Sequence, residues 1–358
     1  MPHDWEASKR RLLATFLGSP NIDRVPFFPL ACEEMICRVS GKTYRELISS
    51  PKIYGNAAIK TYEFLKADTL SIPTAYAGPA EALAFAEANN KDNMINWYDY
   101  KVFMAKQGAI CKTEEDIEKL EIPDHSKISL WDTCISAVKF VQEKTKFPQS
   151  CALGIWSVVQ ELRGVQAYRD MRKSPDLLLQ LCEKVYQSQM DLYNFYNEKV
   201  GQGGTIFFTA YAFNKHMMSF EDAMKYEGQF IKRLQDKTKA RMMIHNCGTT
   251  PYFDEMCRNL DISAVNGSHP LDINYWVRFK EEHPEVTIVG ANIDVSRELF
   301  SGTPLDVEEK VKENISRLAY GGRYAVGPIC CLPWGVSLNN ILAIPKAIKK
   351  WGTYPLKS

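Results

Sequence analysis

The sequence lacks any long apolar run, and no stretch approaches the roughly 18 consecutive apolar residues that a membrane-spanning helix needs. It also lacks an excess of either charge, since 44 basic residues face 43 acidic ones, for a net charge of +1. A chain that binds nucleic acid through a basic surface normally carries such an excess. Residues 1–11 are charged and contain no apolar core of a signal peptide. We therefore expect no membrane association, no nucleic-acid partner and a cytoplasmic location.

Several sequence patterns of common enzyme classes are also missing. No serine, histidine and acid stand in a hydrolase pattern, and no glycine-rich phosphate loop is present. The ten cysteines are scattered over 358 residues without the spacing of a disulfide framework. In a reducing compartment most of them should be small buried apolar residues. Four histidines, which we expect at the surface, lie in polar or terminal contexts: His3, His125, His216 and His283.

What the sequence does contain is a series of eight short β-rich runs, most of them followed by a helical pattern. Several runs are continuously apolar, as in parallel strands that are buried on both faces. The alternation predicts an α/β fold, a (β/α)8 TIM barrel, with an open doubly wound sheet as the alternative. The expected strands are Val25–Pro29, Asp68–Ile72, Cys151–Trp156, Thr205–Thr209, Arg241–His245, Ile262–Asn266, Thr287–Asn292 and Tyr324–Cys330.

The spacing of these runs also bears on domain organisation. We find no internal repeat and no linker, so residues 1–358 are expected to form a single barrel domain. The interval between the second and third expected strands is much longer than the others. Residues from about 75 to 150 are therefore predicted to form an insertion, or a lid over the barrel mouth.

The run His245-Asn246-Cys247-Gly248 closes the fifth expected strand. On an extended strand end, a spacing of two residues places both side chains on the same side. Imidazole nitrogen and thiolate sulfur together suit zinc. A third ligand from the end of the eighth strand, Cys330 or Cys331, would give an open site of the kind that catalytic zinc occupies. The alternative is that His245 is a hydrogen-bonded core residue.

Other polar residues follow the expected strands, and in a barrel the active site lies at the carboxyl ends of the strands. Asn292 and Asp294 could instead cap the next loop and helix. Glu33 and Glu34 follow the first strand and could be solvated. The candidates for catalytic roles are Tyr211 after the fourth strand, Asn266 and His269 after the sixth, and Asn292 and Asp294 after the seventh.

Several motifs together resemble those of a known superfamily. They are Arg24-Val25-Pro26, the His-x-Cys-Gly run, Gly290-Ala291-Asn292-Ile293-Asp294, Gly327-Pro328-Ile329-Cys330 and Ser337-Leu338-Asn339-Asn340-Ile341. The sequence resembles the uroporphyrinogen decarboxylase superfamily from about residue 8 to residue 350. It resembles most its zinc-dependent corrinoid methyltransferase branch, which includes the methylcobalamin:coenzyme M methyltransferases. The resemblance implies a (β/α)8 barrel.

The resemblance also implies a metal site and a chemistry. The zinc ligands would be His245, Cys247 and Cys330, although Cys331 stands where the family usually has glycine, so the choice between the two cysteines stays open. Asn266 and His269 lie nearest to a position where members can have an acid that reaches the metal. The zinc enzyme would move a methyl group between a corrinoid, carried as methylcorrinoid or cob(I)alamin by a partner protein, and a small molecule. That donor or acceptor would be a thiol, a pterin or a methoxylated or methylated compound, as in one-carbon metabolism or O-demethylation.

Two alternative functions are also compatible with the sequence. One is a metal-independent decarboxylase of the same superfamily. The decarboxylases carry an arginine-containing segment after the first strand, whereas this chain has Leu30–Met35 with two glutamates, which would repel a polycarboxylate. The other is a non-catalytic corrinoid- or zinc-binding module, which would hold its metal in a closed four-ligand site.

Overall fold

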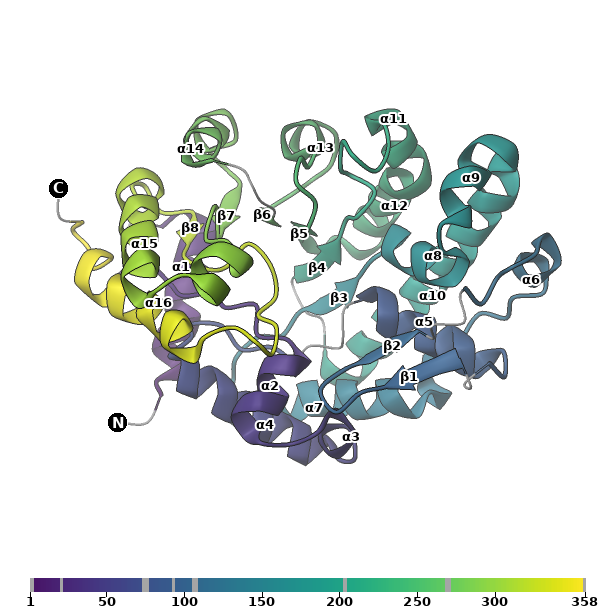
Figure 1. Cartoon of the computed structure of the whole chain (residues 1–358), viewed down its shortest axis with the longest axis horizontal. Coiled ribbons are helices and arrows are strands. Elements are labelled where there is room, and N and C mark those ends of the chain that lie inside the picture. Colours follow the sequence, from purple (N-terminus) through teal and green to yellow (C-terminus); the bar gives the residue numbers. More distant parts are fainter. Residues whose placement is uncertain are drawn as a thin grey trace.

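Six parallel strands, hydrogen-bonded in sequential order, form the centre of the molecule (Figure 1). The computed structural model describes residues 3–19, 22–72, 77–91, 94–104, 109–201, 205–267 and 272–356. Sequential order in a parallel sheet requires a crossover after each strand, which helices supply here. The strands are β3 (Cys151–Leu153), β4 (Thr205–Thr209), β5 (Arg241–Asn246), β6 (Ala264–Gly267), β7 (Thr287–Val289) and β8 (Tyr324–Ala325).

We expected regular strands at the first two strand positions of the barrel. The structure instead has extended segments there, which are joined to their neighbours by single contacts. Phe27 forms an isolated parallel bridge with Val326, and the Asp68 amide donates to Phe27 O at 2.8 Å. Pro26 and Pro29 flank this bridge. Because proline has no N–H to donate, a longer ladder cannot form there. The first segment still lies beside the end of β8 and the second beside the first, and the fold is a (β/α)8 barrel.

The helices lie outside the strands and return the chain to the opposite end of the barrel (Figure 1). Thr303 caps the helix that begins at Pro304. Its side chain accepts a hydrogen bond from the Asp306 amide, and the proline stands at the first helical position, where its missing N–H costs nothing. They are α8 (Trp156–Arg163), α9 (Gln166–Lys173), α10 (Pro175–Val200), α11 (Phe220–Ala223), the π-helix η3 (Met224–Gly228), α12 (Gln229–Thr238), α13 (Phe253–Asn259), α14 (Ile273–Glu282), the π-helix η4 (Val295–Ser301), α15 (Pro304–Leu318) and α16 (Leu338–Trp351).

A small layer of apolar side chains fills the barrel below its mouth. Because strand side chains alternate between two faces, His245 lies two residues beyond Met243 on the same face of β5. Phe207 in this layer stacks on the His245 ring at 5.7 Å between centroids. The layer thus forms the floor beneath His245. It comprises Met243, Ala264, Val289 and Ala325, with Phe16, Phe28 and Phe207 packed against them.

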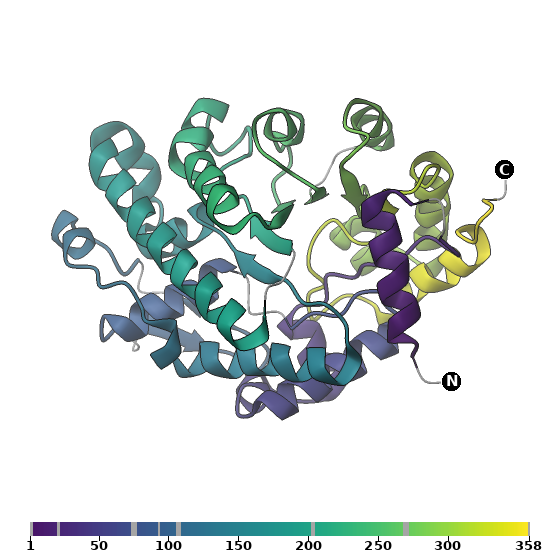
Figure 2. The ribbon, with the colours of Figure 1, turned by 180° about the vertical axis from the view of Figure 1, so that it is seen from behind.

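The amino-terminal helices cover one side of the barrel. Phe16 of α1 reaches the inner layer, and Figure 2 shows this helix from behind. Two helix ends carry capping contacts that the sequence explains, such as the capping box of Thr43 and Glu46. These helices are α1 (Trp5–Leu17), α2 (Glu33–Ser40), α3 (Tyr44–Leu47) and α4 (Pro51–Leu65).

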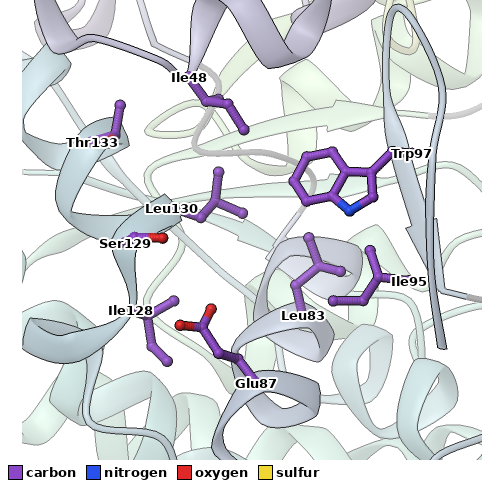
Figure 3. Close-up of a pocket in the computed structure, with 9 residues that line it drawn as sticks. All are labelled: Ile48, Leu83, Glu87, Ile95, Trp97, Ile128, Ser129, Leu130 and Thr133. Atoms are coloured by element: carbon purple, nitrogen blue, oxygen red, sulfur yellow. The ribbon is translucent and has the colours of Figure 1, made fainter. Parts of the chain in front are cut away.

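The expected insertion folds into helices and a hairpin of its own, and its role as a lid stays a prediction. An apolar pocket lies between α5, β1, α7 and the end of α3 (Figure 3). Its lining residues are Ile48, Leu83, Glu87, Ile95, Trp97, Ile128, Ser129, Leu130 and Thr133. The elements are α5 (Ala77–Ala88), β1 (Ile95–Trp97) paired antiparallel with β2 (Val102–Met104), α6 (Glu114–Glu118), the 3-10 helix η2 (His125–Lys127) and α7 (Ser129–Thr145).

His125 and His283 are buried, so our expectation of surface positions was wrong for both. The His125 ring lies between Glu81, with Nε2–O distances of 2.9 and 3.0 Å, and Asp191, at 2.8 Å from Nδ1. Burial alone would lower the pKa of His125, but the two carboxylates outweigh it and raise the pKa to about 9. The buried imidazole is therefore a cation that ties α5 to η2 and α10.

In the part of the chain that the structure describes, no helix combines the length and apolar composition that a membrane crossing requires.

Candidate metal centre

Three possible ligand atoms from β5 and the loop after β8 form a compact triangle at the barrel mouth. His245 Nε2 lies 2.6 Å from Cys247 Sγ, Cys247 Sγ lies 3.2 Å from Cys330 Sγ, and Cys330 Sγ lies 3.9 Å from His245 Nε2. A tetrahedral zinc ion spaces such atoms by about 3.5 to 3.8 Å, so Cys247 would move outward by about 1 Å to admit one. The donor set fits zinc once Cys247 makes this shift.

Asn266 fixes the orientation and the tautomer of His245. The Asn266 amide nitrogen donates to Val289 O at 2.8 Å and to Pro328 O at 3.2 Å. Its oxygen is therefore the atom that faces His245 Nδ1 at 2.6 Å, and Nδ1 must carry the ring proton. The lone pair of Nε2 then points toward the two thiols, as a ligand imidazole requires.

Position 248 requires glycine because the loop after β5 closely approaches Asn214 in the loop after β4. A Cβ atom there would lie 1.6 Å from the side-chain nitrogen of Asn214, so no side chain fits. The Asn246 oxygen accepts the Gly248 amide at 2.8 Å, which turns the backbone sharply after the strand. This turn is what brings Cys247 back over the strand end toward His245.

The thiols also polarise one another. A hydrogen bond from Cys247, with a second from Cys331, holds the pKa of the Cys330 thiol well below its ordinary value. The same contact with Cys330 raises the pKa of Cys247. A divalent cation bound here would deprotonate both thiols.

The sequence matches the uroporphyrinogen decarboxylase (URO-D) family over residues 7–351. The chain belongs to the uroporphyrinogen decarboxylase family. A methyltransferase from Methanosarcina mazei has a similar structure, with a TM-score of 0.76 and 19% sequence identity, over 96% of this chain and 98% of that chain. At that identity the likeness establishes the fold alone. A search of curated proteins gave no match.

In this URO-D family member, Cys330 and not Cys331 joins the triangle. The three atoms of His245, Cys247 and Cys330 all lie within 4.8 Å of one another. The Cys331 thiol instead contacts Cys32, and this contact is the largest cause of the raised pKa of Cys331. The geometry thus favours Cys330 as the third ligand, while metal binding itself stays a prediction.

The other catalytic candidates fall in different places. Tyr211 is largely buried near the triangle, and this burial raises its pKa. Asn292 is 8% exposed, and its side-chain oxygen has no hydrogen-bond partner among the described residues. Asp294 accepts the Ser296 and Arg297 amides and caps η4, which is the alternative role noted above. His269 lies outside the described residues.

Glu33 and Glu34 are buried, at 3% and 9% exposure, and are not solvated as we had considered. Burial raises the pKa of Glu33 to about 7. Glu34 accepts from the Trp334 amide at 2.8 Å and pairs with Lys101 at 2.9 Å. The loop after β8 is thereby attached to the start of α2.

Sequence reasoning missed two residues that shape the site. Asn246 stands between the candidate ligands, and its amide nitrogen donates to Ala210 O at 2.6 Å and Phe213 O at 3.1 Å. Glu227 is fully buried and accepts the amides of Trp156 and Ala212. The position of Asn246 inside the His-x-Cys run was a usable signal, whereas nothing in the sequence near Glu227 sets it apart.

A second group of possible metal ligands, Asp254, Glu282 and His283, lies between α13 and α14. Arg278 pairs with both carboxylates there, at 3.1 Å from Asp254 and 2.8 Å from Glu282. Because the arginine already neutralises the acids, this group is an ion-pair cluster on the outside of the barrel.

Proposed function

We propose that this protein is a zinc-dependent methyltransferase, which moves a methyl group between a corrinoid protein and a small molecule. The small molecule would be a thiol, a pterin or a methoxylated or methylated compound. The observation that carries the proposal is the triangle of His245, Cys247 and Cys330 at the carboxyl end of the barrel, with Asn266 orienting the imidazole. Three protein ligands leave one coordination position for substrate.

The chemistry that zinc supplies when bound is the activation of a thiol, or Lewis-acid assistance to a leaving oxygen, nitrogen or sulfur. The residues around the metal position have further roles in orienting, charge balance and exclusion of water. The Nδ1–H bond of His245 to Asn266 leaves Nε2 as the ring nitrogen that faces the two thiols. Two thiolates with one neutral imidazole balance the charge of the cation, which favours an electron-rich bound substrate. The stacked Phe207 ring keeps water away from the inner side of the imidazole.

The residues after the first strand position argue against a decarboxylase acting on a polycarboxylate. Such a substrate needs cationic groups, preferably arginine forks, at the mouth. Here Glu33 and Glu34 occupy the start of α2, and Lys101 is already paired with Glu34. Arg38, the nearest arginine in this helix, donates to the carbonyls of Trp334 and Val336.

Exposed apolar side chains at the rim of the barrel mouth favour the binding of a protein partner. The segments that follow β4, β7 and β8 each expose a large apolar side chain: Met217 at 37%, Phe300, in η4, at 58% and Trp334 at 41%. Trp334 is held in place by its ring contact with Tyr100, at 5.3 Å between centroids. Exposed apolar side chains around an active site are typical of a surface that another protein covers. A corrinoid protein that presents its cobalt to the mouth would cover this rim.

A visible-spectrum titration tests the proposal. The full chain, loaded with zinc, is mixed with cob(I)alamin or methylcobalamin and with one candidate methyl donor or acceptor at a time. Conversion between the two corrinoid spectra that needs the protein, and that a chelator abolishes, supports zinc-dependent methyl transfer. The matched controls are Cys330→Ala, which removes a proposed ligand, and Cys331→Ala, which does not.

Two results would contradict the proposal. Release of carbon dioxide from a porphyrinogen, unaffected by chelator, would indicate the metal-independent decarboxylase. A zinc ion that is held by four protein ligands, and whose removal unfolds the chain, would indicate a non-catalytic module.

A further inference from the structure

Side chains of α2 hold the exposed part of the loop after β8, which we call the mouth loop (residues 332–336). Glu34 Oε2 accepts the Trp334 amide at 2.8 Å. Arg38, four residues further along α2, donates to Trp334 O at 2.5 Å and also to Val336 O. Both backbone polar groups of Trp334 are therefore bound to side chains of α2 that lie one helical turn apart.

The other carboxylate oxygen of Glu34 is bound by the insertion. Lys101, in the turn between β1 and β2, places its Nζ 2.9 Å from Glu34 Oε1, and Figure 1 shows the end of this hairpin near α2. The two side chains are only 26% and 11% exposed, so solvent and salt screen this ion pair less than they would at an open surface. The same turn is fixed at Asp99, whose carbonyl accepts the Tyr44 amide at 2.6 Å. Glu34 thus joins the insertion to the mouth loop.

Three aromatic side chains from different elements meet around the mouth loop. The ring of Tyr100, next to Lys101, lies 5.3 Å from the ring of Trp334 between centroids. Phe300 of η4 packs so closely on Gly335 that a Cβ atom there would lie 2.8 Å from the phenyl ring. The insertion, the mouth loop and η4 therefore form a continuous aromatic wall (Tyr100, Trp334 and Phe300) at the rim of the barrel mouth.

We propose that Glu34 is a positioning residue that holds the mouth loop, and with it the aromatic wall, and that Lys101 keeps Glu34 in the orientation this requires. One orientation of the carboxylate serves both the lysine and the Trp334 amide. Without the lysine, a poorly exposed carboxylate loses its countercharge, turns toward water and releases the amide. The insertion thereby sets the shape of one side of the mouth. The aromatic wall is the surface that would meet the corrinoid, and this last step rests on the proposed function.

Hydrogen–deuterium exchange of the full-length protein, without metal or ligand, measures how firmly the mouth loop is held. Lys101→Met keeps the length of the side chain but not its charge. We expect exchange of the Trp334 amide to speed up about fivefold in this variant, the effect of losing a partly buried ion pair. Lys101→Arg keeps the charge and should exchange as the unaltered protein does. The matched control is Lys119→Met, because Lys119 is a 74% exposed lysine of the insertion that pairs with Glu115.

Two exchange results overturn the proposal. One is a Lys101→Met protein whose mouth loop exchanges at the rate of the unaltered protein. The other is faster exchange that spreads to the same extent over α5 and α7, because Lys101 would then support the packing of the insertion and not the orientation of Glu34.

A double-mutant cycle shows whether Lys101 acts through Glu34. Glu34→Gln keeps an oxygen that can accept the Trp334 amide but removes the charge that binds Lys101. We expect its exchange rate to rise as in Lys101→Met, and to rise no further when both changes are combined. Effects that add in the combined variant would mean that the two side chains act separately, which overturns the role of Lys101.

The consequence for methyl transfer is measured with methylcobalamin as the probe. In Lys101→Met we expect a higher KM for methylcobalamin and an unchanged kcat, because none of the candidate ligands is altered. If the exchange results are as expected but the unaltered protein transfers no methyl group, the positioning role of Glu34 stands and the proposed function fails. If methyl transfer occurs and Lys101→Met changes neither the KM nor the exchange rate, the proposed function stands and the positioning role is rejected.

Discussion

Asn266 accepts the Nδ1 proton of His245 at 2.6 Å, across the paired strands β6 and β5. The two residues are direct neighbours in the register of the sheet, so the contact follows from strand pairing. It determines which imidazole nitrogen faces Cys247 and Cys330. A metal centre at this mouth therefore depends on one amide that is itself held by two backbone carbonyls.

Removing a proposed ligand should remove the metal. We expect about one zinc per chain in the unaltered protein, and a loss of nearly all of it in His245→Ala, Cys247→Ala or Cys330→Ala. Metal analysis of the purified proteins provides the measurement. Cys331→Ala serves as the matched control, because its thiol is outside the triangle, and it should retain its zinc. Equal zinc content in Cys330→Ala and Cys331→Ala would contradict the assignment.

Asn266→Leu should weaken metal binding without touching a ligand. The His245 ring loses its acceptor, and Val289 O and Pro328 O lose a donor. We expect a fall in zinc affinity of about 10- to 100-fold, as for other residues that orient metal ligands. Competition with a chromogenic chelator measures it. An unchanged affinity would show that the hydrogen bond does not orient the imidazole.

Gly248→Ala should disrupt the turn that carries Cys247. The added methyl group would overlap the Asn214 amide, whose nearest atom lies 1.6 Å from the new Cβ position. We expect overpacking to cost about 1 to 3 kcal/mol in the free energy of unfolding, measured by denaturant titration. Because the overlapping atoms belong to a side chain, Asn214→Ala in the same chain should restore part of the zinc content lost in Gly248→Ala. No restoration would place the strain elsewhere.

The stability of the protein should fall as the pH rises through the range in which His125 loses its proton. The folded pKa of His125, about 9, lies above the unfolded value of 6.5. A raised pKa means that the stabilisation is fully present below about pH 6.5 and is lost as the pH rises through about 9. The difference between the two pKa values corresponds to up to about 3 kcal/mol in the free energy of unfolding.

Thermal or denaturant unfolding between these pH values checks this prediction. His125→Gln should be less stable than the unaltered protein at low pH and should lose most of the pH dependence in this range. His216→Gln is the matched control, since His216 is exposed. The idea fails if the two variants show the same pH profile.

The sequence by itself predicted the barrel and the pair of candidate ligands His245 and Cys247. Apolar runs alternate with helices in the order that β3 to β8 adopt, and the two-residue spacing of His245 and Cys247 predicted that both would lie together at a strand end. Both features are local, because they follow from the period of a strand and from the order of elements along the chain.

Only the tertiary structure decided the contacts between segments that are far apart in the sequence. Cys330 was separated from Cys331 by where each thiol points, which depends on the path of the loop after β8. Likewise, Asn266 became the partner of His245 through strand register, and Glu227 met the loop of Tyr211 through the packing of η3. The sequence reveals which side chains can do chemistry, but their hydrogen-bond partners depend on how strands and loops pack around the barrel.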